Sequence, residues 1–246
     1  MVGAGRVAAG DDVLEIGPGE GVLTDALLAA GARVLAVEKD RDLIPVLQEK
    51  YSAEIASGAL RLVEADVLDF DPAVHGLVAG QYKLVANIPY YITGAIFEKF
   101  LSEDTPPSVA VMLIQKEVAT RIVARDGKES ILSISVKAFG APRIMAKVPA
   151  SAFRPAPKVD SAVLAVDDVS SARFAAFGTP KPQAIRHFFD IVRAGFAHKR
   201  KLLARNLEAV AGREAIGAAL ASRALSEKSR AEDLSLEDWL ALAHAL

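Results

Sequence analysis

The feature that most constrains this chain is an apolar run that leads straight into three closely spaced glycines. Residues 12–16 have the composition of a buried strand, and Gly17, Gly19 and Gly21 follow it at once. Apolar residues then recur at helical spacing over residues 23–30. A strand, a glycine loop and a helix in this order predict an open α/β sheet, in which ligands bind beyond the carboxyl ends of the strands.

The spacing of these glycines excludes two common nucleotide-binding loops. A dinucleotide fingerprint needs G-x-G-x-x-G, and Val22 stands where the third glycine would fall. The chain also has no Walker A sequence. Pro18 lacks a backbone N–H, which leaves the loop fewer donors for a phosphate group. The loop therefore predicts a ligand without phosphates that comes close to the backbone.

Three later apolar runs each end in a polar residue: residues 33–37 before Glu38, residues 60–65 before Asp66, and residues 82–86 before Asn87. An acid about 20 residues after a glycine loop is placed to accept hydrogen bonds from both ribose hydroxyls, which is the role predicted for Glu38. Asp66 can accept from the amino group of an adenine. The alternatives are a solvated or N-capping carboxylate for Glu38 and a turn aspartate for Asp66. Together the strand ends predict a ligand cleft.

The run Asn-Ile-Pro-Tyr after the fourth strand combines groups that can hold a planar base. Pro89 ends the strand ladder. The side-chain oxygen of Asn87 and the carbonyl of Ile88 can accept the hydrogens of an exocyclic amino group, and the ring of Tyr90 can lie on the base. The alternative is a structural asparagine before a proline turn.

Further apolar runs predict a helix at 96–101, a strand at 108–114, a helix from 115, and strands at 131–136 and 159–166. Phe153 lies between the last two strands in a proline-containing loop. It either stacks on a base or packs on the core as an ordinary loop aromatic.

The domain prediction is a cofactor-binding domain at 1–170, a linker at 171–183 and a helical domain at 184–246. The helical part carries the most basic stretch of the chain, and its candidate RNA-binding residues are Arg193, Lys199, Arg200, Lys201 and Arg205. The alternative is a solvated helix face.

Composition narrows the classes of function. The net charge of −2 means that RNA contacts must come from a local patch. The absence of cysteine excludes thiolate metal sites and cysteine nucleophiles. With no membrane-length apolar run and no secretory signal, we expect a cytoplasmic protein. We predict no metal site and a monomer.

The chain resembles a known family over nearly its whole length. The matching stretches are 13–24, 36–40, Asp66, 87–90, 115–119, 148–149, 153–157, 159–163 and 230–235. These resemble the S-adenosylmethionine-dependent rRNA adenine N6-dimethyltransferases. They look most like the small-subunit type, which dimethylates two adjacent adenosines near the 3′ end of 16S rRNA.

The resemblance implies a Rossmann-like class I methyltransferase fold, with a seven-stranded sheet, helices on both faces and a small all-α C-terminal domain. It implies S-adenosyl-L-methionine as cofactor and 16S rRNA in the 30S subunit or its precursor as partner. The implied cofactor-binding residues are Glu15, Gly17, Pro18, Gly19, Glu38, Lys39, Asp66, Val67 and Asn87. The implied catalytic residues are Asn87, Ile88, Pro89, Tyr90 and Phe153.

One family feature is absent from the printed sequence. Family members begin with a segment containing a Gly-Gln-Asn/His-Phe-Leu-type motif, which helps bind the methionine end of the cofactor; here residues 2–9 resemble the end of the helix that follows it. We therefore expect cofactor affinity and activity to depend on whether that segment is needed. Two alternative functions stay open, a 23S rRNA dimethyltransferase of the erythromycin-resistance type and a non-catalytic ribosome assembly factor. A nicotinamide oxidoreductase is disfavoured by the glycine spacing.

Overall fold

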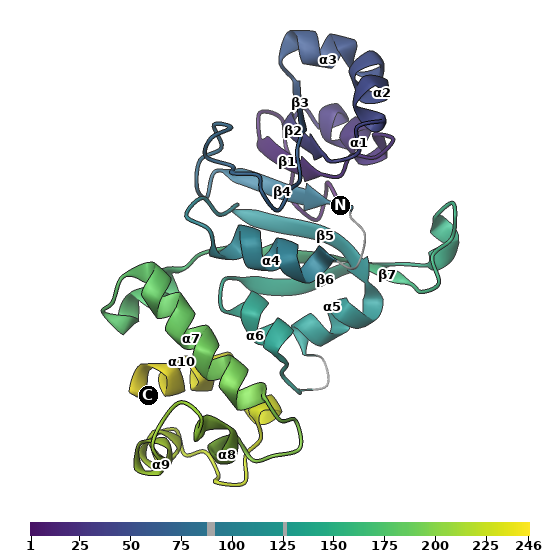
Figure 1. The fold of residues 1–246 in the computed structure, drawn as a ribbon. Coiled ribbons are helices and arrows are strands. Elements are labelled where there is room, and N and C mark those ends of the chain that lie inside the picture. The colour runs from purple at the N-terminus through teal and green to yellow at the C-terminus, as the bar shows by residue number, and fades with distance from the viewer. Residues whose placement is uncertain (88–91, 125–126) are drawn as a thin grey trace. The chain divides into compact units, whose positions relative to one another are not determined.

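The computed structural model describes residues 1–87, 92–124 and 127–246. The chain forms two compact units, drawn in Figure 1. Unit 1 contains residues 1–119 and 140–170, and unit 2 contains residues 120–139 and 171–246. The predicted domain division with a linker at 171–183 stays a prediction.

Unit 1 is built on one seven-stranded sheet. Its strands are β1 (Asp12–Ile16), β2 (Arg33–Glu38), β3 (Leu60–Glu64), β4 (Tyr82–Ala86), β5 (Val109–Gln115), β6 (Ala141–Val148) and β7 (Ser161–Asp167). They lie in the order β3-β2-β1-β4-β5-β7-β6. The first five are parallel, and β7 runs antiparallel to both β5 and β6. The predicted class I methyltransferase fold is confirmed.

The central strands are apolar along their whole length because helices cover both faces of a parallel sheet. In β4 the residues Leu84, Val85 and Ala86 are fully buried, and β5 is buried from Val109 to Ile114. The helices of unit 1 are α1 (Val22–Ala29), α2 (Leu43–Lys50), α3 (Ser52–Ser57) and α4 (Thr93–Ser102), with a short helix η2 (Ala150–Ala152). In Figure 1, α1, α2 and α3 gather at the end of the sheet formed by β1, β2 and β3. The helix α5 (Lys116–Val123) runs from unit 1 into unit 2.

Unit 2 is helical. Its helices are α6 (Ile131–Lys137), η3 (Ala172–Phe177), α7 (Lys181–Phe196), α8 (Leu203–Leu207), α9 (Arg213–Ser222), η4 (Ala231–Asp233) and α10 (Leu236–Ala245). Its core is aromatic: Phe174 and Phe188 meet edge to face, and Trp239 stacks on Phe196. No helix within the described residues of either unit is long and apolar enough to cross a membrane.

Two elements differ from the sequence prediction. Residues 131–136 were predicted as a strand, but they form α6 because Ser130 caps the helix: its Oγ accepts from the N–H of Ser133 at 3.1 Å. The prediction missed β6, an edge strand with a mostly exposed sequence and a register shift between Ile144 and Ala146. The sheet keeps seven strands because β6 replaces the mispredicted one.

Candidate cofactor and substrate site

The carboxyl ends of four adjacent parallel strands lie level with one another. Ile16, at the end of β1, pairs with Val37 on one side and with Ala86 on the other. Glu38 of β2 pairs with Glu64 of β3. The register therefore brings the glycine loop, Glu38, the Asp66 turn and Asn87 to one edge of the sheet, which is where such sheets bind ligands.

The glycine loop at this edge has a backbone that only glycine adopts without strain. Gly17, Gly19 and Gly21 have φ values of 65°, 58° and 88°. Two hydrogen bonds fix the loop, from Gly17 N–H to the Val37 carbonyl at 3.0 Å and from Gly21 N–H to the Pro18 carbonyl at 2.9 Å. A Cβ on Gly19 would have no atom within 4 Å, so the backbone there is open to a ligand.

Glu38 connects the glycine loop to the end of β2. Its Oε1 accepts from the N–H groups of Lys39 at 2.8 Å and Asp40 at 2.9 Å, and its Oε2 accepts from Gly19 N–H at 3.3 Å. An ionised carboxylate has about four lone-pair sites. The single, long bond to Oε2 leaves acceptor capacity beside the loop for the hydroxyls of a ribose.

Glu15 is a fully buried acid one residue before the end of β1. Its Oε2 accepts from the hydroxyl of Thr24 at 2.8 Å, while its Oε1 is buried and has no hydrogen-bond partner within the described part of the chain. Burial raises the pKa of Glu15 to about 7; the Thr24 hydroxyl opposes this shift, and the charges of Asp25 and Glu38 add to it. A buried acceptor without a partner fits a ligand that brings a cationic donor, such as the ammonium group of S-adenosylmethionine.

Asp66 is already paired in the structure. Its Oδ2 lies 2.7 Å from Lys39 Nζ, and its Oδ1 accepts from Leu68 N–H at 3.0 Å. The hydrogen bond from Lys39 holds the pKa of Asp66 below its ordinary value. Val67 next to it is buried. An adenine amino group at this position would share the carboxylate with Lys39.

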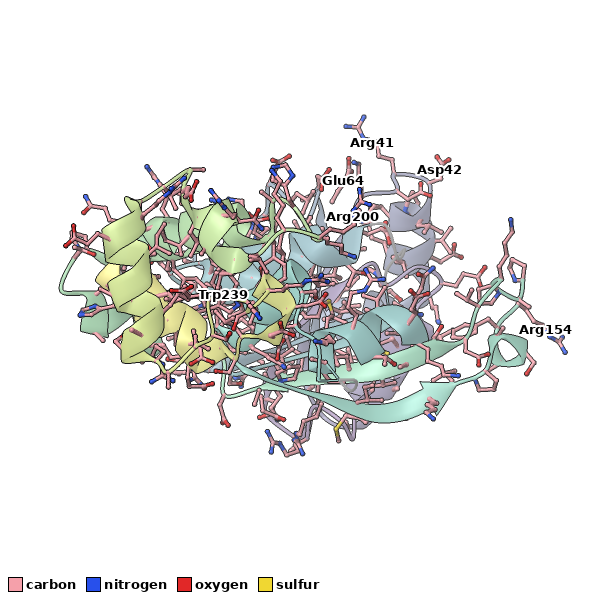
Figure 2. All side chains as sticks on the ribbon, turned by 90° about the horizontal axis from the view of Figure 1, so that it is seen from below. Arg41, Asp42, Glu64, Arg154, Arg200 and Trp239 are labelled. Atoms are coloured by element: carbon pink, nitrogen blue, oxygen red, sulfur yellow. The ribbon has the colours of Figure 1, made fainter. Side chains whose placement is uncertain are left out.

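The predicted target-binding residues are only partly described. Asn87 is exposed directly after β4. The predictions on Ile88, Pro89 and Tyr90 lie outside the described residues. Phe153 is half-buried and packs against the hydrophobic core of unit 1, as the alternative interpretation of this residue expects. Its role toward a base stays a prediction. The loop that carries it extends beyond the sheet between β6 and β7 (Figure 1), and Arg154 points outward at its end in Figure 2.

The candidate RNA-binding residues of unit 2 fall into two groups. Lys199, Arg200 and Lys201 are exposed in the turn between α7 and α8, which we call the basic turn, residues 198–201. These three side chains form no ion pair with any of the described residues. Arg193 and Arg205 are instead paired, with Asp190 at 2.7 Å and Glu208 at 3.3 Å.

A buried asparagine fixes the backbone of the basic turn by hydrogen bonds. The side-chain amide of Asn206 donates to the carbonyls of Gly195 at 2.6 Å and His198 at 3.2 Å. The N–H of Lys201 closes the turn on the His198 carbonyl at 3.0 Å. Lys199, Arg200 and Lys201, which pair with no acid among the described residues, therefore lie on a fixed backbone, which suits contacts to a phosphate chain.

The sequence prediction did not include two residues that support the site. Thr24 is the hydroxyl partner of Glu15, and Tyr51 contacts the glycine loop from the end of α2. Thr24 lies within the stretch 13–24 that resembles the family, so the resemblance could have identified it as a site residue. Tyr51 lies 30 residues from its partner, and no local pattern points to it. Within the described residues no group of three or more acidic or histidine side chains is placed to hold a metal.

The sheet order, the glycine loop and the acid that ends β2 define the class of Rossmann-like, S-adenosylmethionine-dependent methyltransferases. The model of one family, ribosomal RNA adenine dimethylase, matches residues 4–246. The chain belongs to this family and is an rRNA adenine dimethylase-type methyltransferase, as the sequence predicted.

Two relatives and two solved structures show how near the match is. A protein of Dehalococcoides mccartyi named ribosomal RNA small subunit methyltransferase A is 38% identical over 234 residues, 93% of this chain and 76% of that protein. A protein of Deinococcus radiodurans with the same name is 40% identical, over 99% of this chain and 78% of its own. The structure of the 23S rRNA methyltransferase ErmE has a TM-score of 0.74 and 27% identity, covering 100% of this chain and 94% of its own. The structure of a dimethyladenosine transferase from Plasmodium falciparum has a TM-score of 0.77 and 26% identity, and the match covers 98% of this chain and 91% of that protein.

Proposed function

We propose that this chain transfers methyl groups from S-adenosylmethionine to N6 of two adjacent adenosines near the 3′ end of 16S rRNA in the small ribosomal subunit. The observation that carries the reaction is the alignment of the glycine loop, Glu38, Asp66 and Asn87 at one edge of the sheet. The choice of RNA rests on the relatives. Identity is 38–40% to the two small-subunit proteins and 27% to ErmE, which acts on 23S rRNA.

The cofactor is assigned to unit 1 by the groups that the strand ends offer. The open backbone at Gly19 lets the ligand come close, and Glu38 accepts from its ribose. Asp66 and Val67 lie where its adenine would be bound. Glu15 offers the buried acceptor for its ammonium group. When bound, the cofactor supplies a methyl group on a sulfonium, which is an electrophile without any metal.

Asn87 positions the nitrogen that accepts the methyl group. The lone pair of adenine N6 is delocalised into the ring, which makes it a poor nucleophile. Hydrogen bonds from the amino group to the side-chain oxygen of Asn87 and to the carbonyl of Ile88 favour a pyramidal nitrogen aimed at the methyl group. Positioning of this kind supplies much of the rate. The carbon–nitrogen bond forms as the carbon–sulfur bond breaks, and the electron pair of the broken bond stays on sulfur as a neutral thioether. The N6 proton then becomes acidic and is lost to solvent, so no general base is assigned. The adenine must first leave its stack.

The buried acid predicts how cofactor binding depends on pH. If the Glu15 carboxylate receives an ammonium group, binding favours the deprotonated form of a carboxyl whose pKa is raised to about 7 by burial. Affinity for S-adenosylmethionine should therefore fall as pH drops below 7, approaching about tenfold per pH unit. Between pH 5.5 and 7 the ammonium itself stays charged, since free α-amino groups titrate near about 7.7–8.0. Calorimetric titration across this range measures the slope.

The matched variant for this test is Glu15→Gln, which keeps the shape and the bond to Thr24 and removes the titration. It should bind more weakly than the unmodified chain at pH 7.5, by about tenfold, and show a flat pH profile. The same raised pKa makes the free energy of unfolding of the unmodified chain depend on pH in the opposite sense to cofactor affinity. The contribution of Glu15 to this free energy is fully present below the unfolded pKa of 4.5 and is lost as pH rises through 7. A pH slope that persists in Glu15→Gln would assign the titration to another group.

The basic turn predicts a salt-dependent contribution to RNA binding. Reversing Lys199, Arg200 and Lys201 to glutamate should weaken binding to 30S subunits and lower the slope of log K against log salt by up to about 3. The matched control is Arg193→Glu with Arg205→Glu, because these cations already face acids and should change the slope less. Filter binding at several salt concentrations gives the slopes. An unchanged slope in the triple variant would mean that the turn is only a solvated surface.

Transfer of labelled methyl groups to unmodified 30S subunits and, separately, to 23S rRNA tests the function itself. The experiment uses this chain alone and this chain preceded by a family-type N-terminal segment. Label in 16S rRNA supports the proposal, and the comparison of the two proteins shows whether that segment is needed. Label only in 23S rRNA would support the erythromycin-resistance type, and 30S binding without label from either protein would support an assembly factor.

A further inference from the structure

Lys50, the last residue of α2, and Tyr51, which follows it, contact the glycine loop. The hydroxyl of Tyr51 lies 2.7 Å from the carbonyl oxygen of Gly21 and 2.6 Å from Oδ1 of Asp25. The ammonium of Lys50 donates to the carbonyl of Glu20 at 3.0 Å and to Oδ2 of Asp25 at 3.0 Å. Two consecutive side chains thus hold two consecutive carbonyls of the loop, and one carboxylate connects them.

The contact at Gly21 is tight as well as polar. Tyr51 is 3% exposed, and a Cβ on Gly21 would lie 2.1 Å from its hydroxyl oxygen. Gly21 also has a φ of 88° and precedes the first turn of α1, where its carbonyl accepts from Asp25 N–H at 2.8 Å. The backbone conformation of Gly21 is therefore fixed both by the start of α1 and by the packing of the Tyr51 hydroxyl against it.

Charges reinforce this arrangement. The hydrogen bond from Tyr51 and the contact with Lys50 hold the pKa of the Asp25 carboxyl below its ordinary value, so it is a carboxylate at neutral pH. The Lys50 ammonium also lies 4.8 Å from the centre of the Tyr51 ring. The phenol has one proton for two acceptors, so this proton is shared between Oδ1 of Asp25 and the carbonyl oxygen of Gly21 in a three-centre hydrogen bond.

We infer that Lys50 and Tyr51 form a clamp that holds the glycine loop in the conformation that binds the cofactor, which makes them positioning residues for the reaction. This inference rests on the proposed function, in which the same loop approaches S-adenosylmethionine. Neither side chain needs to touch the cofactor. The clamp acts through the carbonyls of Glu20 and Gly21, which directly follow the open backbone at Gly19.

The clamp lowers the cost of ordering the loop when the ligand binds. A loop that is already fixed loses less conformational freedom on binding, and this gain appears in affinity rather than in the chemical step. Loosening the clamp should therefore raise the dissociation constant of the cofactor and leave the rate at saturating cofactor unchanged. A merely structural contact would lower thermal stability without changing this balance.

The test is Tyr51→Phe, which keeps the ring and removes the hydroxyl. The matched control is Tyr82→Phe: Tyr82 is also buried and its hydroxyl donates to a backbone carbonyl, that of Thr105 at 2.9 Å, but it starts β4 at the opposite edge of the sheet. Calorimetry should show Kd for S-adenosylmethionine raised about fivefold in Tyr51→Phe and unchanged in Tyr82→Phe. KM for the cofactor should rise in parallel while kcat stays within about twofold of the unmodified chain.

Lys50→Met provides a second variant, which keeps the apolar part of the side chain and removes the charge. It should also raise the Kd for S-adenosylmethionine. Three outcomes would overturn the clamp. One is an unchanged Kd in Tyr51→Phe while the unmodified chain binds normally, which leaves the proposed function standing. Another is an equal loss of affinity in Tyr82→Phe, which would mean that affinity follows stability. The third is no cofactor binding by the unmodified chain either alone or preceded by a family-type N-terminal segment, which contradicts the proposed function together with the clamp.

Discussion

Replacing Asn87 with alanine is expected to reduce methyl transfer to 16S rRNA by at least about 100-fold, because misplacing the attacking nitrogen removes the gain from positioning. The substitution deletes the oxygen proposed to hold the amino group and leaves the strand before it intact. Since Asn87 is exposed, the fold should lose no more than about 0.5 kcal/mol. Transfer is measured at saturating S-adenosylmethionine with unmodified 30S subunits.

A matched control lies at the other end of the same strand. Gln81 is an exposed amide directly before β4, and Gln81→Ala should keep full activity. Cofactor affinity of Asn87→Ala should be measured too, because Asn87 is also a predicted cofactor residue; a lower rate at saturation separates the two roles. Undiminished transfer by Asn87→Ala would remove this residue from the reaction.

Replacing Trp239 with alanine is expected to destabilise unit 2 by about 3–5 kcal/mol. Trp239 is fully buried, it stacks on Phe196 with 5.4 Å between ring centres, and a Cβ on Gly195 would lie 2.3 Å from its ring. The indole thus fills the space between α7 and α10, and alanine would leave a large cavity. Figure 2 shows Trp239 among the C-terminal helices.

The measurement is helical circular dichroism during denaturant unfolding, because Trp239 is the single tryptophan of the chain and its fluorescence is lost with it. Trp239→Phe is the matched variant. The indole N–H has no hydrogen-bond partner in the described part of unit 2, so phenylalanine forfeits volume but no polar contact and should cost clearly less than alanine. Equal losses for both variants would mean that volume does not decide the stability here.

The elements around the glycine loop could be predicted because several local signals agree there. Residues 12–16 are apolar, the glycines need positive φ, and a helical pattern follows, so sequence and structure give the same strand, loop and helix. The strand ends could be placed to within one residue: β4 stops before the exposed Asn87 as predicted, while β2 runs one residue further than predicted and includes the buried Glu38. Consistency between local and global preferences explains this success.

The sequence prediction failed where the local pattern was ambiguous, weak or absent. Residues 131–136 alternate apolar and polar side chains in part, as a strand does, but Ser130 and Ser133 cap each other and start a helix. The strand β6 has an exposed edge sequence with little burial to reveal it. Tyr51 could not be connected to Gly21 from sequence, because the contact depends on how α2 folds back onto the loop.

The most direct test of the central claim is the identity of the product. Unmodified 30S subunits are incubated with the chain and S-adenosylmethionine, and the 16S rRNA is digested and analysed by mass spectrometry, with primer extension to locate the modified bases. We expect N6,N6-dimethyladenosine at two adjacent positions near the 3′ end of 16S rRNA and none in 23S rRNA treated in parallel. Dimethyladenosine in 23S rRNA alone, or none in either RNA from the chain with or without a family-type N-terminal segment, would contradict the proposed function.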